Sequence, residues 1–305
     1  MKLKFVDMQK LILLSALFCL SINSIAQNYK QKFDKLYEDN DTVKIKTLLV
    51  DWEKSNPNDP ELYTSAFNFY FSTSNYEVLA LDGKVSGGEV LQLIDSTGKP
   101  AGYIRSVPEI KSEKLEKAFS YADKGIQKFP NRLDIRFGKC FVFGQIGDYE
   151  NFTKEIIKTV EYSKTNGNNW QWTNNKKLDD GQDFMLNTIQ EYLAQLYNTE
   201  DDALLENMTR IGDATIKHYP DKIEILSTTS VAHMLRKNYD KAIEYLKHAE
   251  KLNPKDFIVL NNIAQGYKLK GDKGNAIKYY ELTEKYGDEQ AKQQARQNIK
   301  ELKKQ

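Results

Sequence analysis

Two segments near the C-terminal end of this 305-residue chain match each other at an offset of 34 residues, which narrows the possible folds to stacked helical units. Four residue pairs keep this step, namely Ala242 and Ala276, Leu226 and Leu260, Leu246 and Tyr280, and Pro220 and Pro254. Within each segment, apolar residues recur three and four positions apart, which predicts a pair of amphipathic helices. A single helical pair cannot bury its apolar face alone, so neighbouring pairs must stack.

The residue types at these positions resemble those of the tetratricopeptide repeat. The second segment carries the pattern at Leu260, Ile263, Ala264, Tyr267, Gly271, Asp272, Ala276 and Tyr280. Small residues allow two antiparallel helices to approach closely, and large ones fill the seam between them. Thr283 and Asp288 depart from the pattern in this segment, as do Ser230 and His233 in the first. The resemblance implies an all-α fold, a right-handed superhelix of helical hairpins that binds a protein or peptide without a cofactor.

The alternation of helical patterns and turns extends upstream of these two repeats. Helices are predicted over 29–37, 43–54, 61–74, 112–130, 133–143, 152–162, 184–197 and 203–219. With the two clear repeats, they give about five to six hairpins over residues 27–288. Residues 289–305 are mostly Gln, Lys, Arg and Glu, with one apolar stripe at Ala291, Ala295, Ile299 and Leu302. This last segment is predicted as a polar helix that caps the open end of the stack.

Two insertions interrupt the helical pattern. The first, residues 76–106, contains two short β-type runs around a turn rich in Gly and Pro, which predicts a β-hairpin. It falls between the two helices of one repeat. Two interpretations of this hairpin remain open. It shields the apolar end of the stack, or its free edge pairs with a strand from a partner.

The second insertion, residues 163–183, places Trp170 and Trp172 in a polar loop that contains several asparagines. A flat aromatic ring beside amides suits a carbohydrate or a peptide, because the ring stacks and the amides orient the ligand. The alternative is that one or both rings fold back to cover the helical core. A glycan-binding or nutrient-uptake accessory protein is therefore the second hypothesis for the function.

The first hypothesis is a scaffold that binds a protein or a peptide. The resemblance implies that the first helix of each hairpin lines a concave face. That face would carry Met234 from one repeat and Asn261, Gln265 and Lys268 from the next. This mixed surface suits an extended peptide or a partner helix. It lacks the concentration of Lys, Arg and Asn that would clamp a peptide carboxylate.

The first 26 residues predict an export signal. Three lysines within the first ten residues precede an apolar run over 11–20, and Ser24-Ile25-Ala26 supplies the small residues of a cleavage site before Gln27. The run is shorter than the ~20 residues of a membrane-spanning helix, so we expect no integral membrane segment after cleavage. An uncleaved anchor, or lipid attachment at Cys19, is the alternative. We expect the mature protein to be periplasmic or secreted.

Composition argues against several classes of function. The signal would remove three of the 44 Lys and Arg residues and one of the 43 Asp and Glu residues, which leaves 41 against 42. A nearly neutral chain has no strong field to attract nucleic acid. Cys140 would be the one remaining cysteine, so no internal disulfide is expected. We expect its side chain to be buried where its helix packs against a neighbouring helix.

The three histidines, His218, His233 and His248, are not spaced as metal ligands, and His233 is expected to be a packing residue. No group of acid, base and nucleophile is evident in the sequence. We therefore predict neither a metal site nor a cofactor, and we expect that the protein is not an enzyme.

Overall fold

The computed structural model describes residues 28–82, 90–94, 99–110 and 112–304. The predicted export signal, residues 1–26, lies outside the described residues. The chain divides into two compact units. The first contains the described residues up to Ile135 together with Thr173–Asn175, and the second contains Arg136–Trp172 and the chain from Lys176 onward.

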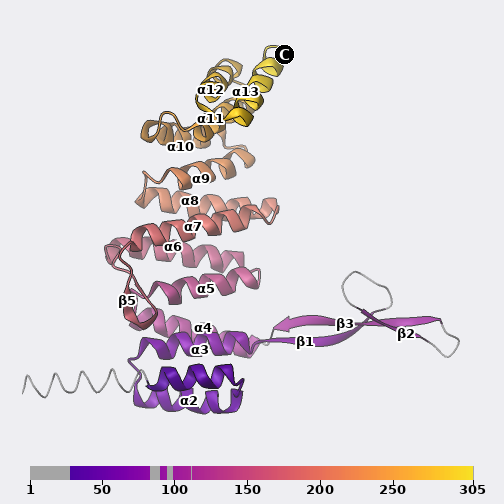
Figure 1. Ribbon diagram of the computed structural model, residues 1–305, viewed down its shortest axis with the longest axis vertical. Helices are drawn as coiled ribbons and strands as arrows, with labels where there is room; N and C mark the ends of the chain where they lie inside the picture. The colour runs from indigo at the N-terminus through magenta and orange to yellow at the C-terminus, as the bar shows by residue number, and fades with distance from the viewer. Residues whose placement is uncertain (1–27, 83–89, 95–98, 111, 305) are drawn as a thin grey trace, which may run out of the picture. The chain divides into compact units, whose positions relative to one another are not determined.

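The first unit is built from helices that begin at aspartate caps. Residues 28–38 are helical, and they are followed by α2 (Thr42–Ser55), α3 (Pro60–Ser72) and α4 (Ser112–Lys128), shown in Figure 1. The Asp41 carboxylate accepts a hydrogen bond from the Lys44 backbone N–H at the start of α2, and Asp59 accepts one from the Glu61 N–H at the start of α3. These caps satisfy N–H groups that have no partner within the helix.

A core of large side chains holds these helices together. Its fully buried members include Ile45, Leu49 and Trp52 of α2 and Leu62, Tyr63, Ala66 and Phe69 of α3. Tyr29 of the first helix stacks on Trp52, with ring centroids 5.5 Å apart. Burial of large aromatic surface contributes strongly to the stability of such a small stack.

A three-stranded antiparallel sheet is inserted between α3 and α4. Its strands are β1 (Asn75–Asp82), β2 (Val90–Ile94) and β3 (Pro100–Ile110), and their order is β1-β3-β2. The predicted hairpin is confirmed as the β2–β3 pair, which contains an irregularity between Leu93 and Ile94. The structure adds β1, which pairs with β3 over its whole length. The pattern after residue 75 predicts the end of helix α3 but carries no turn signal that marks a strand.

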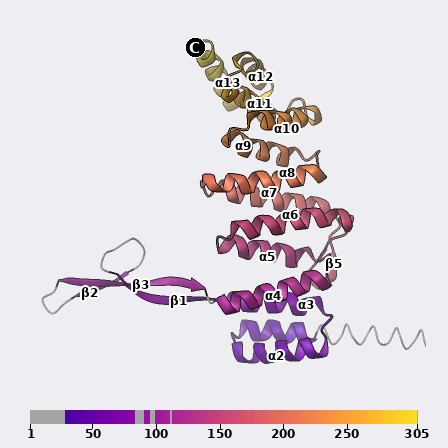
Figure 2. The ribbon, with the colours of Figure 1, turned by 180° about the vertical axis from the view of Figure 1, so that it is seen from behind.

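The second unit continues the helical hairpins. Its helices are α5 (Leu133–Gln145, of which the first three residues belong to the first unit), α6 (Tyr149–Thr165), α7 (Gly181–Tyr197), α8 (Leu205–His218), α9 (Ile223–Leu235), α10 (Tyr239–Leu252), α11 (Phe257–Lys270), α12 (Lys273–Tyr286) and α13 (Glu289–Leu302). Figure 2 shows these helices following one another in chain order. Counted over the described part of the chain, the two units contain six hairpins followed by α13. The predicted fold class, an all-α stack of tetratricopeptide-like hairpins with a small β insertion, is confirmed.

The regular repeats pack as the 34-residue step predicts. Ala242 of α10 and Ala276 of α12 are fully buried, because the paired helices leave no room for a larger side chain. Gly271 ends α11 in the left-handed conformation, with φ of 87°, and Asp272 then caps α12 by accepting the Asn275 N–H. The polar helix α13 covers α12 with a buried stripe at Ala295, Ile299 and Leu302. No helix among the described residues has the length and apolar character needed to cross a membrane.

Candidate functional site

The first unit contains a cavity of 630 Å³ between the helix over 28–38 and α3. We call it the α3 groove, and its lining residues are Lys30, Phe33, Asp34, Tyr37, Glu61, Thr64, Ser65, Asn68, Phe71, Ser72, Asn75 and Thr173. On each of the two helices these residues recur at intervals of three and four, so each helix presents one continuous face. The groove is therefore formed by the first helices of two successive hairpins.

The walls of the α3 groove combine aromatic rings with polar groups. The rings of Phe33 and Tyr37 stack with centroids 5.6 Å apart. Lys30 and Asp34 form an ion pair with an N–O distance of 2.5 Å one helical turn apart. Asn68 is exposed on α3, so its amide is open to a ligand. Apolar rings beside a few oriented polar groups are typical of ligand-binding clefts.

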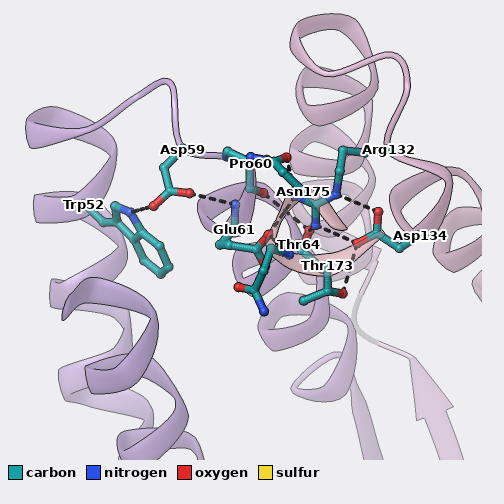
Figure 3. Close-up of polar contacts among 10 residues, drawn as sticks. Trp52, Asp59, Pro60, Glu61, Thr64, Arg132, Asp134, Thr173 and Asn175 are labelled. Carbon is teal, nitrogen blue, oxygen red and sulfur yellow. Dashed lines mark hydrogen bonds and ion pairs between the residues drawn. The ribbon is translucent and has the colours of Figure 1, made fainter. Parts of the chain in front are cut away.

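Glu61 and Thr173 of the groove lining also belong to a buried ion cluster, which Figure 3 shows. Arg132 is fully buried, and it donates two hydrogen bonds to Asp134, of 2.8 and 2.7 Å, and one of 2.7 Å to Glu61 Oε1. The same Glu61 oxygen accepts the backbone N–H of Asn174 at 2.8 Å. Burial opposes the charge of Arg132, but the hydrogen bonds and charge of Asp134 and Glu61 raise the pKa of the guanidinium above its usual value.

The segment Thr173–Asn175 reaches this cluster because of its backbone conformation. Asn174 and Asn175 have φ of 61° and 54°, in the left-handed region that asparagine tolerates better than most residues. The turn directs the Asn174 N–H to Glu61, while the Thr173 hydroxyl lies 3.3 Å from Asp134 Oδ2 and the Asn175 amide oxygen 3.4 Å from Arg132 Nη1. The segment thus fixes one oxygen of Glu61 and adds Thr173 to the wall of the groove.

Asp59 adds a third carboxylate near the cluster. It accepts hydrogen bonds from Trp52 Nε1 at 2.9 Å and from the Glu61 backbone N–H at 3.0 Å. Burial raises the pKa of Asp59, because removal from water disfavours the charged carboxylate, and the hydrogen bonds from Glu61 and Trp52 only partly offset this. Glu61 and Asp134 are both paired with the guanidinium of Arg132, and Asp59 lies two residues before Glu61 with partners of its own, so the surroundings of Glu61 contain two further carboxyl groups.

Two acceptors that line the groove have no hydrogen-bond partner among the described groups. They are Oε2 of Glu61 and Oγ of Ser65, on successive turns of α3. The residues are 6% and 2% exposed. Buried polar atoms almost always have a partner, because an unmet hydrogen bond costs about 1–3 kcal/mol. Two buried acceptors without a partner, in residues that line a cavity, are therefore a feature suited to a ligand that donates hydrogen bonds.

The prediction that Trp170 contacts a ligand needs correction. Trp170 is fully buried, with its ring 5.9 Å from that of Tyr162 and beneath the Arg136 guanidinium, so neither ring face is open to a ligand. The ring packs there because it fills the space between α6 and the start of α7. Trp172 is half-buried, and its ring meets the edge of Phe184 at 5.1 Å. The structure therefore supports, for Trp170, the alternative in which the ring covers the core, and it gives no support to a glycan partner. A role for the half-buried Trp172 stays a prediction.

The predicted residues of the later repeats mostly have internal partners. Met234 is buried rather than exposed, because it lies against Gly266 of α11. Gln265 accepts a hydrogen bond of 2.9 Å from the Tyr280 hydroxyl, and Lys268 donates one of 2.7 Å to Asn298 of α13. Asn261 is half-buried. The structure does not gather these four side chains into a cavity with the tryptophans.

The packing predictions for Cys140 and His233 are confirmed. Cys140 is fully buried, and burial raises the pKa of its thiol well above the usual range, which makes it a poor nucleophile. His233 is buried against the ring of Tyr245, and its Nε2 lies 2.9 Å from Asp213 Oδ1. His248 is on the surface beside Asp221, with Nε2 and Oδ1 3.0 Å apart.

The residues of the α3 groove are not among the predicted site residues. The helix predicted over 61–74 has an ordinary apolar pattern, which gives no reason to single out its polar residues. One feature of the sequence could have indicated the groove. Glu61, Ser65 and Asn68 are spaced by four and three residues, which places three polar residues on one face of a helix whose other faces are buried.

Comparison with known proteins finds similarity among solved structures. Neither a protein-family model nor a curated protein matches the chain. Among solved structures, the chain is similar to YrrB, a TPR protein described as having an unusual peptide-binding site, with 12% identity, coverage of 82% of this chain and 97% of that one, and a TM-score of 0.39. It is similar to the C-terminal part of a TPR repeat-containing protein from Cytophaga hutchinsonii, with 13% identity, coverage of 84% and 78%, and a TM-score of 0.40. It is also similar to the TPR domain of P58(IPK), with 12% identity, coverage of 92% and 65%, and a TM-score of 0.31. These similarities concern the fold alone.

Proposed function

We propose that this protein is a non-catalytic scaffold that binds a segment of another protein in the α3 groove. The observation that carries the proposal is a cavity lined at regular helical intervals by the first helices of two successive hairpins. Its volume of 630 Å³ lies within the range of about 300–1,000 Å³ that is usual for ligand sites. A groove between parallel rows of side chains suits an extended segment better than a compact small molecule.

The chemistry of the groove supports binding rather than catalysis. The Glu61 carboxylate is held by Arg132 and by the Asn174 N–H, which fixes it in place. Ser65 has no hydrogen bond to a base, whereas an activated serine nucleophile needs one. The groove thus offers aromatic contact area and hydrogen-bonding groups, which is what recognition of a polypeptide requires.

We further propose that the protein works outside the cytoplasm, in the periplasm or after secretion. The support is the order of a basic start, an apolar run and small residues within the first 26 positions. N-terminal sequencing of the protein isolated from the cell envelope or the medium tests this. A chain that starts at Gln27 supports export with cleavage, whereas a retained Met1 contradicts it.

The binding proposal is tested with a variant that fills the groove. Asn68→Trp places a large ring on the exposed groove face of α3. Its matched control is Asp51→Trp, which places the same ring on α2 at an exposed position outside the groove. Affinity capture from envelope extract, followed by mass spectrometry, should recover a protein with the wild type and the control but not with Asn68→Trp. Equal recovery with all three proteins would show that the partner binds elsewhere.

A further inference from the structure

We propose that the α3 groove receives a lysine or arginine side chain of the bound segment, with Glu61 Oε2 and Ser65 Oγ as its acceptors. This inference rests on the proposed function and specifies its ligand. It starts from the two buried acceptors without partners, which stand on one face of α3 and line the same cavity.

The two unpartnered acceptors favour a ligand side chain that donates hydrogen bonds. A carboxylate without one of its hydrogen bonds cannot be satisfied by an apolar side chain or by another carboxylate, because neither donates a hydrogen bond at neutral pH. An ammonium or guanidinium group donates several hydrogen bonds and accepts none, so a buried one needs hydrogen-bond acceptors around it. Both acceptors are shielded from bulk solvent, and a charge-assisted hydrogen bond is stronger in such a place than in water.

The charges around the cavity also favour a basic side chain. Glu61 and Asp134 are two carboxylates paired with one guanidinium, that of Arg132, which is already engaged in the cluster. Lys30 is the cation in the groove wall, and its ammonium is held by Asp34 at 2.5 Å. A cation that enters the groove is therefore attracted by Glu61, while the Lys30–Asp34 pair has no net charge. A carboxylate that enters is repelled by Glu61.

The rest of the lining suits the stem of such a side chain. Lysine and arginine carry several methylene groups below their charged end, and these pack well on aromatic rings. Phe33, Tyr37 and Phe71 supply those rings beside the acceptors. The groove thus offers an apolar wall for the stem and acceptors for the head.

The test begins with a selection of random 12-residue peptides displayed on phage against the purified protein. Peptides that bind the wild type and the Asp51→Trp control, but not Asn68→Trp, define binders of the groove. We expect these binders to share a lysine or arginine at one fixed position. Groove binders that show no such preference would overturn this inference and leave the proposed function standing. A selection that yields no peptide sensitive to Asn68→Trp would overturn both.

The second step couples the basic side chain to Glu61. A labelled peptide from the selection is titrated by fluorescence polarisation beside a copy in which the basic residue is replaced by norleucine. Binding to the wild type should weaken by about tenfold or more, as expected for the loss of a charge-assisted hydrogen bond. With Glu61→Gln the two peptides should bind much more alike, whereas with the exposed-site control Asp51→Asn the full difference should remain. A difference that Glu61→Gln leaves unchanged would overturn the inference.

Circular dichroism and a thermal melt show whether Glu61→Gln keeps the fold, since Arg132 depends on this carboxylate. Where it does not, Ser65→Ala replaces it in the same titration. The Ser65 hydroxyl has no partner within the described chain, so its removal should leave the fold intact. Ser65→Ala should reduce the preference for the basic peptide, and an unreduced preference would count against Ser65 as an acceptor and against the proposal.

Discussion

The α3–α4 and α11–α12 hairpins solve the same packing problem with different side chains. In α11–α12, small residues such as Ala264 and Ala276 are fully buried, and the helices are joined by a short turn at Gly271. In α3–α4, aromatic rings fill the seam, with Tyr70 stacked on Tyr121 at 5.7 Å, and the whole β sheet separates the two helices in sequence.

The two hairpins also differ in their buried charge. Glu61 of α3 pairs with the buried Arg132, which follows α4 in the chain, whereas charges on α11, such as Lys270 with Asp240, pair at the surface. Packing of two helices does not require a buried ion cluster, since α11–α12 pack without one among their own described residues. The comparison shows that the regular repeats pack through small apolar residues, whereas the α3 region packs through aromatic rings and includes a buried ion cluster.

The largest expected loss of stability comes from breaking a buried ion pair, and breaking an exposed pair should cost much less. Arg132→Met leaves Glu61 and Asp134 buried without their cation, which should lower the free energy of unfolding by ~3–5 kcal/mol. Lys270→Met removes an exposed pair with Asp240 and should change stability little. Urea denaturation of the two variants measures the difference. Similar losses for both would mean that the Arg132 cluster is no more important to stability than a surface pair.

A nearly equal effect is expected at the tryptophan loop of the second unit. Trp170→Ala removes a fully buried ring and should cost about 3–5 kcal/mol. Trp172→Ala removes a half-buried ring and should cost less. Thermal melts of both variants beside the wild type test this. If Trp170→Ala melts like the wild type, its ring is not part of the core and the ligand-platform interpretation returns.

The regular hairpin should be sensitive to volume rather than to charge. Ala276→Leu forces a larger side chain into the contact between α11 and α12 and should cost ~1–3 kcal/mol. Lys278→Leu introduces the same side chain at an exposed position of α12 and serves as its control. Denaturant midpoints give the comparison. The small-residue contact would be refuted by a control that loses as much stability as Ala276→Leu.

The caps of the two hairpins should respond to pH in opposite directions. Burial raises the pKa of Asp59 at α3, so its contribution to stability is present at low pH and is lost as pH rises through its folded-state pKa. The side-chain and backbone hydrogen bonds from Asn275 lower the pKa of Asp272 at α12, so its contribution is present above the unfolded-state pKa and is lost as pH falls through the folded-state pKa. NMR titration of the two carboxyl groups should place Asp59 above Asp272. The reverse order would contradict at least one of the two pKa directions.

The smallest effect concerns the unpaired hydroxyl of the groove. Ser65→Ala removes an oxygen that bonds nothing in the described chain, so stability should change by no more than about 0.5 kcal/mol. Ser163→Ala in the second unit is the matched variant, because the Ser163 hydroxyl lies 2.5 Å from that of Tyr219, and it should cost about 1 kcal/mol. Equal losses in denaturation would show that Ser65 is an ordinary structural serine.

Sequence reasoning recovers the hairpins but not the groove, for a physical reason. Helical pairs are specified by local periods, so Ala242, Ala276 and the turn at Gly271 are visible in the sequence without knowledge of distant contacts. The groove depends on pairs far apart in the chain, such as Glu61 with Arg132, which are 71 positions apart. No local period connects such residues. The same limit explains Trp170, because its burial depends on how the loop folds back and not on its polar neighbours.

The bond from the Asn174 N–H to Glu61 spans 113 positions of the chain. During synthesis, α3 leaves the ribosome before Asn174 has been made. The Glu61 carboxylate therefore has no bond to this N–H until the sheet, α4 and two further helices have been made. Contacts of such long range close late, because they require a large part of the chain to be ordered first. The later hairpins close from neighbouring segments and need no such delay. The α3 groove therefore cannot be completed until residues 113 positions further along the chain have been made, although α3 is among the first helices to be translated.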